Sequence, residues 1–426
     1  MVATLDILGY AIIAAALGQA GVGFAGMLGR QLHRSRLERQ DRELFKARAA
    51  HLLRAAEAER QKRELSWTGL RKFTVERKVP EADGIASFYL RPHDGQPIPP
   101  FEPGQYLTFQ FRIPGQTKNV VRCYSLSDAP TRLERYRITV KELPPPPDRP
   151  DAPPGLASTH LHRGIAEGDT LDVRAPNGHF FLDRASSAPV VLIGGGIGLT
   201  PMLSMLTTIC DSGDPRETWL FYGVRHGGEH ILPDTLAGFQ REHPNVRVVI
   251  CYSEPRADDR PERDYDHAER ISVDLLRRHL TGPNYQFYLC GPPPMMRALY
   301  QGLSDWGVPE AAINYEAFGP ATVKTTAQAS PPEATDGDAG DTAVTVEFAR
   351  SGRTVTWRPD DGALLDVAEA NDVAIDCGCR AGNCGTCLTA IKQGEVSYLS
   401  EPGVPPEEGS CLTCIAVPKG RLVLDA

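Results

Sequence analysis

The stretch that decides the fold is APVVLIGGGIGLTPMLSML, from Ala188 to Leu206. Its short apolar run does not alternate with polar residues, which predicts a strand buried on both faces. The glycines predict a tight turn, and Thr200-Pro201 predicts the first turn of a helix. A strand, turn and helix of this kind can hold a pyrophosphate at the helix N-terminus. Because the glycines depart from the G-x-G-x-x-G spacing, the run by itself is equally typical of an ordinary tight turn.

Further apolar runs follow this stretch at regular intervals. ETWLFYGVR, VRVVICYSE and YQFYLCGPP are separated by segments with helical character. Strands that alternate with helices are typical of a parallel sheet. We therefore predict an α/β parallel-sheet nucleotide domain over residues 187–322.

The region before this domain has a different sequence pattern. Between Trp67 and Pro176 lie six short β-like runs, split by Gly, Pro and Asp. This spacing predicts an antiparallel β-barrel over residues 67–186. One run, RCYSLSD at Arg122–Asp128, combines a cation, an aromatic ring and a hydroxyl. An arginine can hold a phosphate and a tyrosine can cover a flavin ring.

The C-terminal region is marked by cysteines. The chain has ten, and six of them fall in its last fifty residues, which favours metal ligation in a reducing compartment. DCGCRAGNCGTC, at Asp376–Cys387, fits the C-x4-C-x2-C spacing of a [2Fe–2S] centre only when it starts at Cys379. The fourth ligand is Cys411 or Cys414. A zinc site stays open as an alternative, because the last four of these cysteines form two C-x2-C pairs.

Two resemblances narrow these alternatives. CRAGNCGTC and LTCIAVP resemble the plant-type ferredoxin domain. The resemblance implies an α+β (β-grasp) domain over residues 343–426 and a [2Fe–2S] cluster. The implied cluster ligands are Cys379, Cys384, Cys387 and Cys414.

Several other segments resemble the ferredoxin–NADP+ reductase superfamily, among them PGQYLTF, RCYSLSD, ITVKE, PGLASTHL, GGGIGLTP, YLCGPPPMM and YEAFGP. YEAFGP resembles members that use FAD rather than FMN. The flavin-binding residues that the resemblance implies are Arg122, Tyr124, Ser125, Leu126, Val140, Lys141, Gly155, Ala157, Ser158 and Phe318. Those implied for NAD(P)H, with NADH preferred, are Gly195, Gly196, Gly198, Thr200, Pro201, Cys290 and Gly291. Ser125, Cys290 and Glu316 would carry out hydride transfer.

The N-terminus is apolar and uncharged from Leu8 to Gly29, which is long enough for a transmembrane helix over residues 1–30. Arginines follow at once, so we expect a single pass in a bacterial inner membrane with the catalytic domains in the cytoplasm. A signal peptide and a buried soluble helix are the competing interpretations. Small residues lie near one face of the helix and could contact a partner helix. They are Gly18, Gly21, Ala25 and Gly29.

Two connecting segments complete the predicted multidomain chain. Residues 31–66 are charged and free of Pro and Gly, which predicts a helical spacer, whereas residues 323–342 have the composition of a flexible linker. The net charge of −8 does not indicate nucleic-acid binding.

The order flavin, nucleotide, ferredoxin resembles reductases of the phthalate dioxygenase reductase type. It implies hydride transfer from NAD(P)H to FAD, then single electrons through the cluster to an oxygenase- or hydroxylase-type redox protein, which we expect to be membrane-bound. A respiratory NADH:quinone reductase and a non-catalytic subunit of a membrane complex are the alternatives.

Overall fold

The computed structural model describes residues 57, 60, 61, 63–117, 119–145, 150–318, 343–378, 380, 382, 385–399, 402 and 406–426. The chain divides into two compact units, Met1–Glu64 and Leu65–Ala426. In the first unit the few described residues are helical, and Arg60 forms ion pairs with Glu57 and Glu64. The predicted transmembrane helix lies outside the described residues. Within the described part of the chain, every helix is too short or too polar to span a lipid bilayer.

The first domain of the second unit is a six-stranded antiparallel sheet in the order β4-β3-β6-β1-β2-β5. Its strands are β1 (Arg71–Ala82), β2 (Ile85–Pro92), β3 (Tyr106–Phe111), β4 (Val120–Ser125), β5 (Tyr136–Lys141) and β6 (Thr170–Asn177). A bridge between Leu126 and Ile138 joins the two edges, so the sheet curls into the predicted barrel. Phe73, Phe88 and Phe109 belong to its fully buried core.

A short helix follows Gly155. It consists of α2 (Leu156–Thr159), followed by one π-helical turn, His160–Gly164. Lys78 donates hydrogen bonds from Nζ to the carbonyls of Leu161, His162 and Ile165, which lie at the C-terminal end of this helix, where carbonyl groups need partners from outside the helix.

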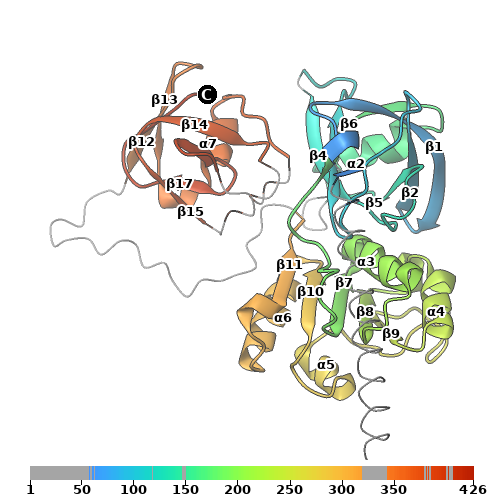
Figure 1. Cartoon of the computed structure of the whole chain (residues 1–426). Helices are drawn as coiled ribbons and strands as arrows, with labels where there is room; N and C mark the ends of the chain where they lie inside the picture. Colours follow the sequence, from blue (N-terminus) through green and yellow to red (C-terminus); the bar gives the residue numbers. More distant parts are fainter. Residues whose placement is uncertain are drawn as a thin grey trace, which may run out of the picture. The chain divides into compact units, whose positions relative to one another are not determined.

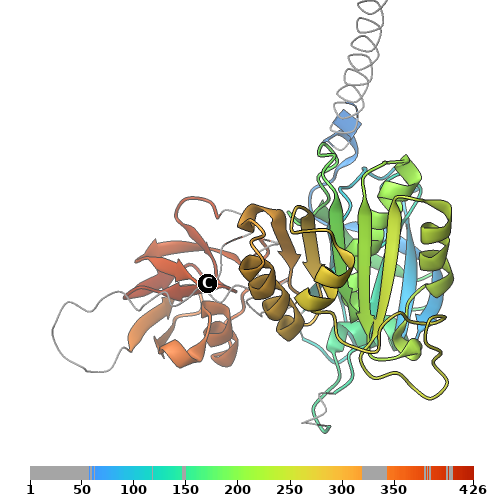
Figure 2. The ribbon, with the colours of Figure 1, turned by 90° about the horizontal axis from the view of Figure 1, so that it is seen from below.

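The second domain is a parallel five-stranded sheet in the order β11-β10-β7-β8-β9. Its strands are β7 (Val190–Gly195), β8 (Thr218–Val224), β9 (Val246–Tyr252), β10 (Gln286–Cys290) and β11 (Ile313–Glu316), and its helices are α3 (Leu199–Ser212), α4 (Pro233–Glu242), α5 (Val273–His279) and α6 (Pro293–Asp305). Helices α3 and α4 cover one face, and α5 and α6 cover the other (Figures 1 and 2). Alternate residues of β7 enter these two cores, which explains its unbroken apolar run.

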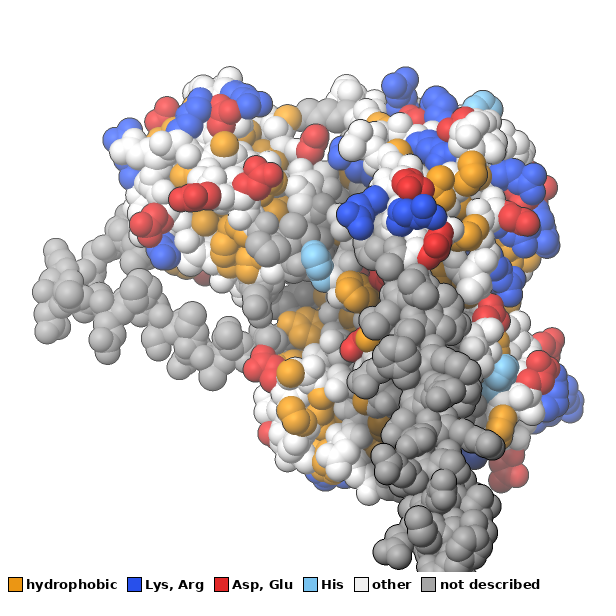
Figure 3. Space-filling view, viewed as in Figure 1, with side chains coloured by type: hydrophobic (Ala, Val, Ile, Leu, Met, Phe, Trp, Pro, Cys, Tyr) orange, Lys and Arg blue, Asp and Glu red, His pale blue; other side chains and the backbone are white. Residues whose placement is uncertain are grey.

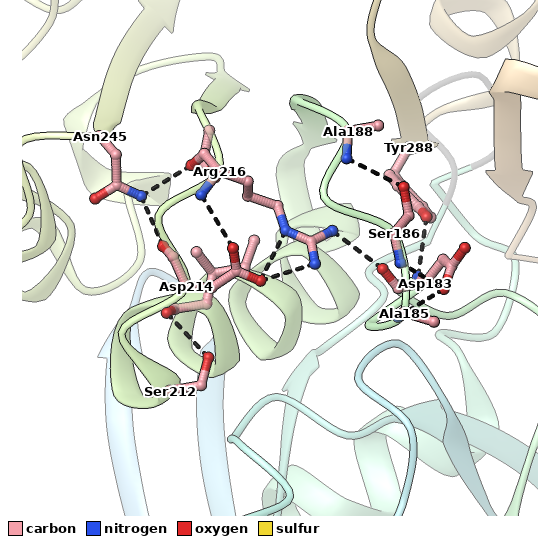
Figure 4. Close-up of polar contacts among 11 residues, drawn as sticks. Asp183, Ala185, Ser186, Ala188, Ser212, Asp214, Arg216, Asn245 and Tyr288 are labelled. Atoms are coloured by element: carbon pink, nitrogen blue, oxygen red, sulfur yellow. Dashed lines mark hydrogen bonds and ion pairs between the residues drawn. The ribbon is translucent and has the colours of Figure 1, made fainter. Parts of the chain in front are cut away.

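A buried arginine anchors the segment that joins the two domains (Figure 4). Arg216 is 6% exposed and forms an ion pair with Asp214, while its Nη1 donates to the carbonyl of Asp183, 3.0 Å away. Asn245 donates to the carbonyls of Asp214 and Arg216. The connecting segment is therefore tied to the same end of the sheet from which β8 and β9 begin.

The third domain is the expected α+β (β-grasp) unit. Its main sheet has the order β13-β12-β18-β14-β16, and β15 pairs with β17. The strands are β12 (Val344–Phe348), β13 (Arg353–Trp357), β14 (Leu388–Gln393), β15 (Val396–Tyr398), β16 (Ser410–Leu412), β17 (Ala416–Pro418) and β18 (Leu422–Leu424). Helix α7 (Leu364–Ala370) packs its buried face against this core. The predicted linker, residues 323–342, lies outside the described residues.

Charged side chains of both signs are interspersed on the face shown in Figure 3. A mixed surface of this kind does not present the continuous basic field that nucleic-acid binding requires on that face.

The close approach of the glycine turn to β10 can be tested by substitution. A Cβ at Gly198 would lie 2.3 Å from the carbonyl oxygen of Cys290, and this backbone atom cannot move aside. We expect Gly198→Ala to lower the free energy of unfolding of the nucleotide domain by about 1–3 kcal/mol, measured by thermal unfolding. Gly282→Ala is the matched control, since nothing lies within 4 Å of its Cβ. Equal melting temperatures for the two variants would contradict the packing argument.

Candidate functional site

Three residues of the predicted hydride-transfer group lie together. Cys290 ends β10 and Glu316 ends β11, and the parallel register places them opposite each other. On the other side of Cys290 the register places Gly194 of β7. Ser125, the last residue of β4, comes from the barrel, and its Oγ donates to Glu316 Oε2 at 3.5 Å. The carboxyl ends of three parallel strands thus meet the end of a barrel strand, as expected for a ligand site in an open α/β sheet.

Glu316 carries a buried carboxyl group, and no cation contacts it within the described part of the chain. It is 5% exposed, and its polar contact is with the Ser125 hydroxyl. Burial raises the pKa of Glu316 to about 8, although the hydrogen bond from Ser125 opposes the rise. Burial, with Glu316 nearby, also raises the pKa of the Cys290 thiol well above its usual range. At neutral pH both groups therefore carry a proton beside the hydroxyl of Ser125.

A cavity extends from Ser125 along the barrel and is bordered by most of the predicted flavin residues. They include Arg122, Tyr124, Ser125, Lys141, Gly155, Ala157, Ser158 and Phe318. Arg122 and Tyr124 alternate with Ser125 on the strand, yet all three border the cavity because β4 ends at Ser125. A Cβ at Gly155 would lie 2.7 Å from Leu143 Cβ, so the turn requires glycine. A cation for phosphate, an aromatic ring and an apolar wall together fit FAD.

Other predicted residues support this site without bordering the flavin cavity. Leu126 and Val140 are buried in the barrel core beneath it. Thr200 Oγ1 donates to the carbonyl of Ile197, which closes the turn at the start of α3, and Pro201 occupies the first turn. Gly195 and Gly291 pack closely together, since a Cβ at Gly291 would lie 3.1 Å from Gly195 Cα. A Cβ on either glycine would also overlap the side chain of Met295. Gly196 has a φ of +55°, which favours glycine.

A second, polar cavity of about 520 Å³ opens beside the end of β8. It is bordered by Lys141, Arg225, His226, Glu229 and Arg256, together with residues of both domains. Glu229, in the 3-10 turn Gly227–Glu229, is 5% exposed and forms ion pairs with Arg225 and Lys141. Burial disfavours its charge, but hydrogen bonds from these two cations prevail and lower the pKa of Glu229 to about 2.

The structure describes two of the four predicted cluster ligands. Cys387 and Cys414 are buried, come from different segments and have sulfur atoms 3.1 Å apart. Cys379 and Cys384 lie outside the described residues, and among the described residues no group of three or more metal-ligating side chains comes together. Gly382 and Gly385 have φ values of +74° and +68°. The positive φ expected for glycines in a cluster-wrapping loop is therefore present.

The structure also describes the two remaining cysteines of this region, Cys377 and Cys411. Cys377 packs against the small core cluster that contains Cys387 and Cys414. Cys411 is fully buried in the domain core with Val346 and Phe348. Cys377 Sγ lies 3.7 Å from Arg380 Nη2 and 3.9 Å from a Glu369 oxygen. A convergent pair of cysteine sulfurs beside a loop with left-handed residues fits a [2Fe–2S] cluster.

Sequence reasoning missed part of the site. Tyr106, Leu143, Leu156 and Ile197 also border the flavin cavity, although the quoted segment PGQYLTF contains Tyr106. Asp83 and Arg256 border the polar cavity without having been predicted there. Asp83 and Arg256 come from connecting loops, where no periodicity marks a side chain as facing a site.

Comparison with known protein families agrees with this geometry. Residues 74–182 match an oxidoreductase FAD-binding domain, residues 192–301 an oxidoreductase NAD-binding domain, and residues 346–419 a 2Fe-2S iron-sulfur cluster binding domain. The chain is an oxidoreductase with FAD, NAD(P)H and [2Fe–2S] cofactors. Its domain order is that of phthalate dioxygenase reductase.

Known proteins resemble either part or nearly all of this oxidoreductase. The structure of phthalate dioxygenase reductase is 26% identical, with a TM-score of 0.53, and covers 84% of this chain and 98% of its own. The FAD/NAD-binding domain of nitric oxide dioxygenase from Vibrio cholerae is 32% identical, with a TM-score of 0.52, over 59% of this chain and 100% of its own. The flavohemoprotein of Halalkalibacterium halodurans is 41% identical over 255 residues, 60% of this chain and 61% of that protein. The oxidoreductase thus spans about three fifths of the curated relatives it matches.

The assignment of the fourth cluster ligand gives a direct prediction. Cys414→Ser should lose the cluster, because it removes one member of the convergent sulfur pair. Cys411→Ser should retain about two irons per chain, because its thiol lies in the domain core. Iron content and visible absorbance measure both outcomes. Cluster loss in Cys411→Ser with retention in Cys414→Ser would reverse the assignment.

The raised pKa of Glu316 predicts a pH-dependent stability. Between about pH 4.5 and 8 the folded protein keeps a proton that the unfolded chain has released, so stability falls as pH rises, by up to about 1.4 kcal/mol per pH unit. Glu316→Gln does not titrate. Its melting temperature relative to the wild type should therefore rise from pH 5 to pH 8. The exposed Glu134→Gln is the control, and a pH-independent difference for Glu316→Gln would refute the burial argument.

Proposed function

We propose that the chain is a membrane-anchored NAD(P)H-dependent reductase that delivers single electrons to an oxygenase- or hydroxylase-type protein. When bound, NAD(P)H supplies a hydride, FAD accepts it, and the [2Fe–2S] cluster passes the electrons on one at a time. The observation that carries the proposal is the meeting of Ser125, Cys290 and Glu316 beside the flavin cavity.

The protein groups at this meeting point have defined roles in the proposal. Ser125 and protonated Glu316 hold a proton at the edge of the cavity, where a reduced flavin needs one. Cys290, neutral and fully buried, shapes the place where the nicotinamide would lie. Gly198 allows the helix start to approach the carbonyl of Cys290, which keeps the nucleotide turn and the reacting group in register.

We further propose that NADH is preferred over NADPH. Arg225, the cation at the end of β8, is already bound by Glu229 at 2.5 Å. A 2′-phosphate would meet this ionised carboxylate, whereas the hydroxyl groups of an unphosphorylated ribose could donate to it. The polar cavity therefore favours the coenzyme without the extra phosphate.

The membrane anchor and the acceptor form the remaining part of the proposal. The uncharged run Leu8–Gly29, followed by arginines, supports a single-pass anchor in a bacterial inner membrane with the catalytic domains in the cytoplasm. The small residues Gly18, Gly21, Ala25 and Gly29 would pack against a helix of a membrane-bound acceptor. The chain has the same domain order as phthalate dioxygenase reductase, which supports a protein acceptor of the oxygenase class.

An anaerobic reduction experiment tests this function. The full-length protein should sediment with membranes and require a mild detergent for purification. NADH should bleach the flavin and then the cluster absorbance, with a kcat/KM at least roughly tenfold above that of NADPH. In a Cys384→Ser control, flavin reduction should persist while the cluster signal is missing.

The acceptor is then distinguished by adding a ubiquinone analogue. Slow or cluster-independent reoxidation supports a dedicated protein acceptor. Fast, cluster-dependent reoxidation would instead identify a respiratory NADH:quinone reductase. Purified protein without flavin absorbance would overturn the proposal in favour of a non-catalytic subunit.

A further inference from the structure

Lys141 lies where the two cavities of the oxidoreductase meet. It is the last residue of β5 and is shared by the linings of the flavin cavity and the polar cavity. Its side chain is 29% exposed, so the ammonium can reach either space. Residues on either side of it serve the barrel itself, because Glu142 N donates to the carbonyl of Gly84 and Val140 is buried in the core. The backbone of Lys141 is therefore held in place, whereas its ammonium group can turn toward an anion in either cavity.

The anion that Lys141 contacts belongs to the nucleotide domain. Lys141 Nζ lies 2.8 Å from Glu229 Oε1. The same oxygen accepts from Arg225 Nη2 at 2.5 Å and from Arg225 Nε at 3.1 Å, while Oε2 accepts from the Arg225 backbone N–H at 3.3 Å. Three donors on one carboxylate oxygen leave it little capacity for a further partner.

The number of donors on Glu229 matters because of where this residue lies. Glu229 follows the end of β8, where an open α/β sheet binds the ribose of a dinucleotide. A ribose hydroxyl could donate to Oε1 of this carboxylate only if one of the three donors on that oxygen moved away. Arg225 is sixty per cent exposed at its side chain but belongs to the same loop and donates from both its backbone and its side chain. Lys141 contributes a single bond from another domain and is the donor that can leave most readily.

We propose that Lys141 is a positioning residue that couples the flavin cavity to the nucleotide cavity through Glu229. The diphosphate of FAD in the flavin cavity would attract the ammonium of Lys141. Glu229 would then be released from one donor and could accept a ribose hydroxyl of the coenzyme. Occupancy of the flavin cavity therefore raises the affinity of the nucleotide cavity, and linkage requires the reverse effect to be equal. This inference rests on the proposed function, because it takes the polar cavity as the site of the coenzyme's ADP-ribose half.

The coupling can be measured without any redox reaction. The probe is ADP-ribose, which lacks the nicotinamide and so cannot stack on the flavin ring. Its Kd is determined by calorimetry for the full-length protein in detergent, first FAD-free and then FAD-loaded. We expect FAD to strengthen ADP-ribose binding by roughly fivefold or more in the wild type. Lys141→Met and Glu229→Gln should each reduce this ratio to about 1, because each removes the ion pair that links the cavities.

A matched control uses an ion pair of similar length elsewhere on the barrel. Lys72 Nζ lies 2.9 Å from Asp172 Oδ1 and borders neither cavity, so Lys72→Met should keep the wild-type ratio. If Lys141→Met fails to bind FAD, Glu229→Gln still decides the question, because it keeps the lysine.

Each outcome has a distinct meaning. Equal Kd values for FAD-free and FAD-loaded wild type, or an unchanged ratio in Glu229→Gln, would overturn the coupling while leaving the reductase function intact. Failure of ADP-ribose to bind either form would overturn the coupling and the assignment of the nucleotide site together.

Discussion

The site depends on the register of three parallel strands at their carboxyl ends. Gly194, Cys290 and Glu316 lie side by side because β7, β10 and β11 pair in this register. The turn after β7 can pass over Cys290 only because Gly198 has no side chain. A shift of the register by one residue would turn the side chains of Cys290 and Glu316 to the opposite face of the sheet. Backbone pairing and one glycine contact thus bring the nucleotide turn, the thiol and the carboxyl group to the same edge.

Two buried carboxyl groups on this edge differ in charge for a simple electrostatic reason. Glu229 and Glu316 are both 5% exposed. Glu229 is bound by Arg225 and Lys141 and has a pKa of about 2, whereas Glu316 contacts only a hydroxyl among the described residues and has a pKa of about 8. The ionised Glu229 can therefore attract hydrogen-bond donors and repel phosphate, while Glu316 holds a proton. The fold separates these two tasks by placing cations beside one group and an apolar core beside the other.

Much of this arrangement could be predicted from the chain. The unbroken apolar run of β7, the glycine turn and Thr200-Pro201 determine a strand, a turn and a helix by local geometry alone. The meeting of Ser125, Cys290 and Glu316 followed from a resemblance and not from the spacing of the residues. Lys141 was expected at the flavin, yet its ammonium contacts Glu229 in the other domain. Such a contact depends on the packing of two domains, and no periodicity in either sequence segment contains it.

The sequence by itself determined a barrel, a parallel sheet and a cysteine-rich unit in this order, because strand periodicity, turn glycines and cysteine spacing are local properties of the chain. The cofactors FAD, NAD(P)H and [2Fe–2S] were implied by the resemblance of its motifs to known families. On spacing alone the sequence left Cys411 and Cys414 open, because either could be the distant fourth cysteine after the C-x4-C-x2-C run. The resemblance to plant-type ferredoxins implied Cys414, and the tertiary structure places Cys411 in a core with Val346 and Phe348 and places Cys414 3.1 Å from Cys387. It also decided the protonation of Glu316 and Glu229, because a pKa depends on which cations and how much water surround the group, and these neighbours come from segments far apart in the chain.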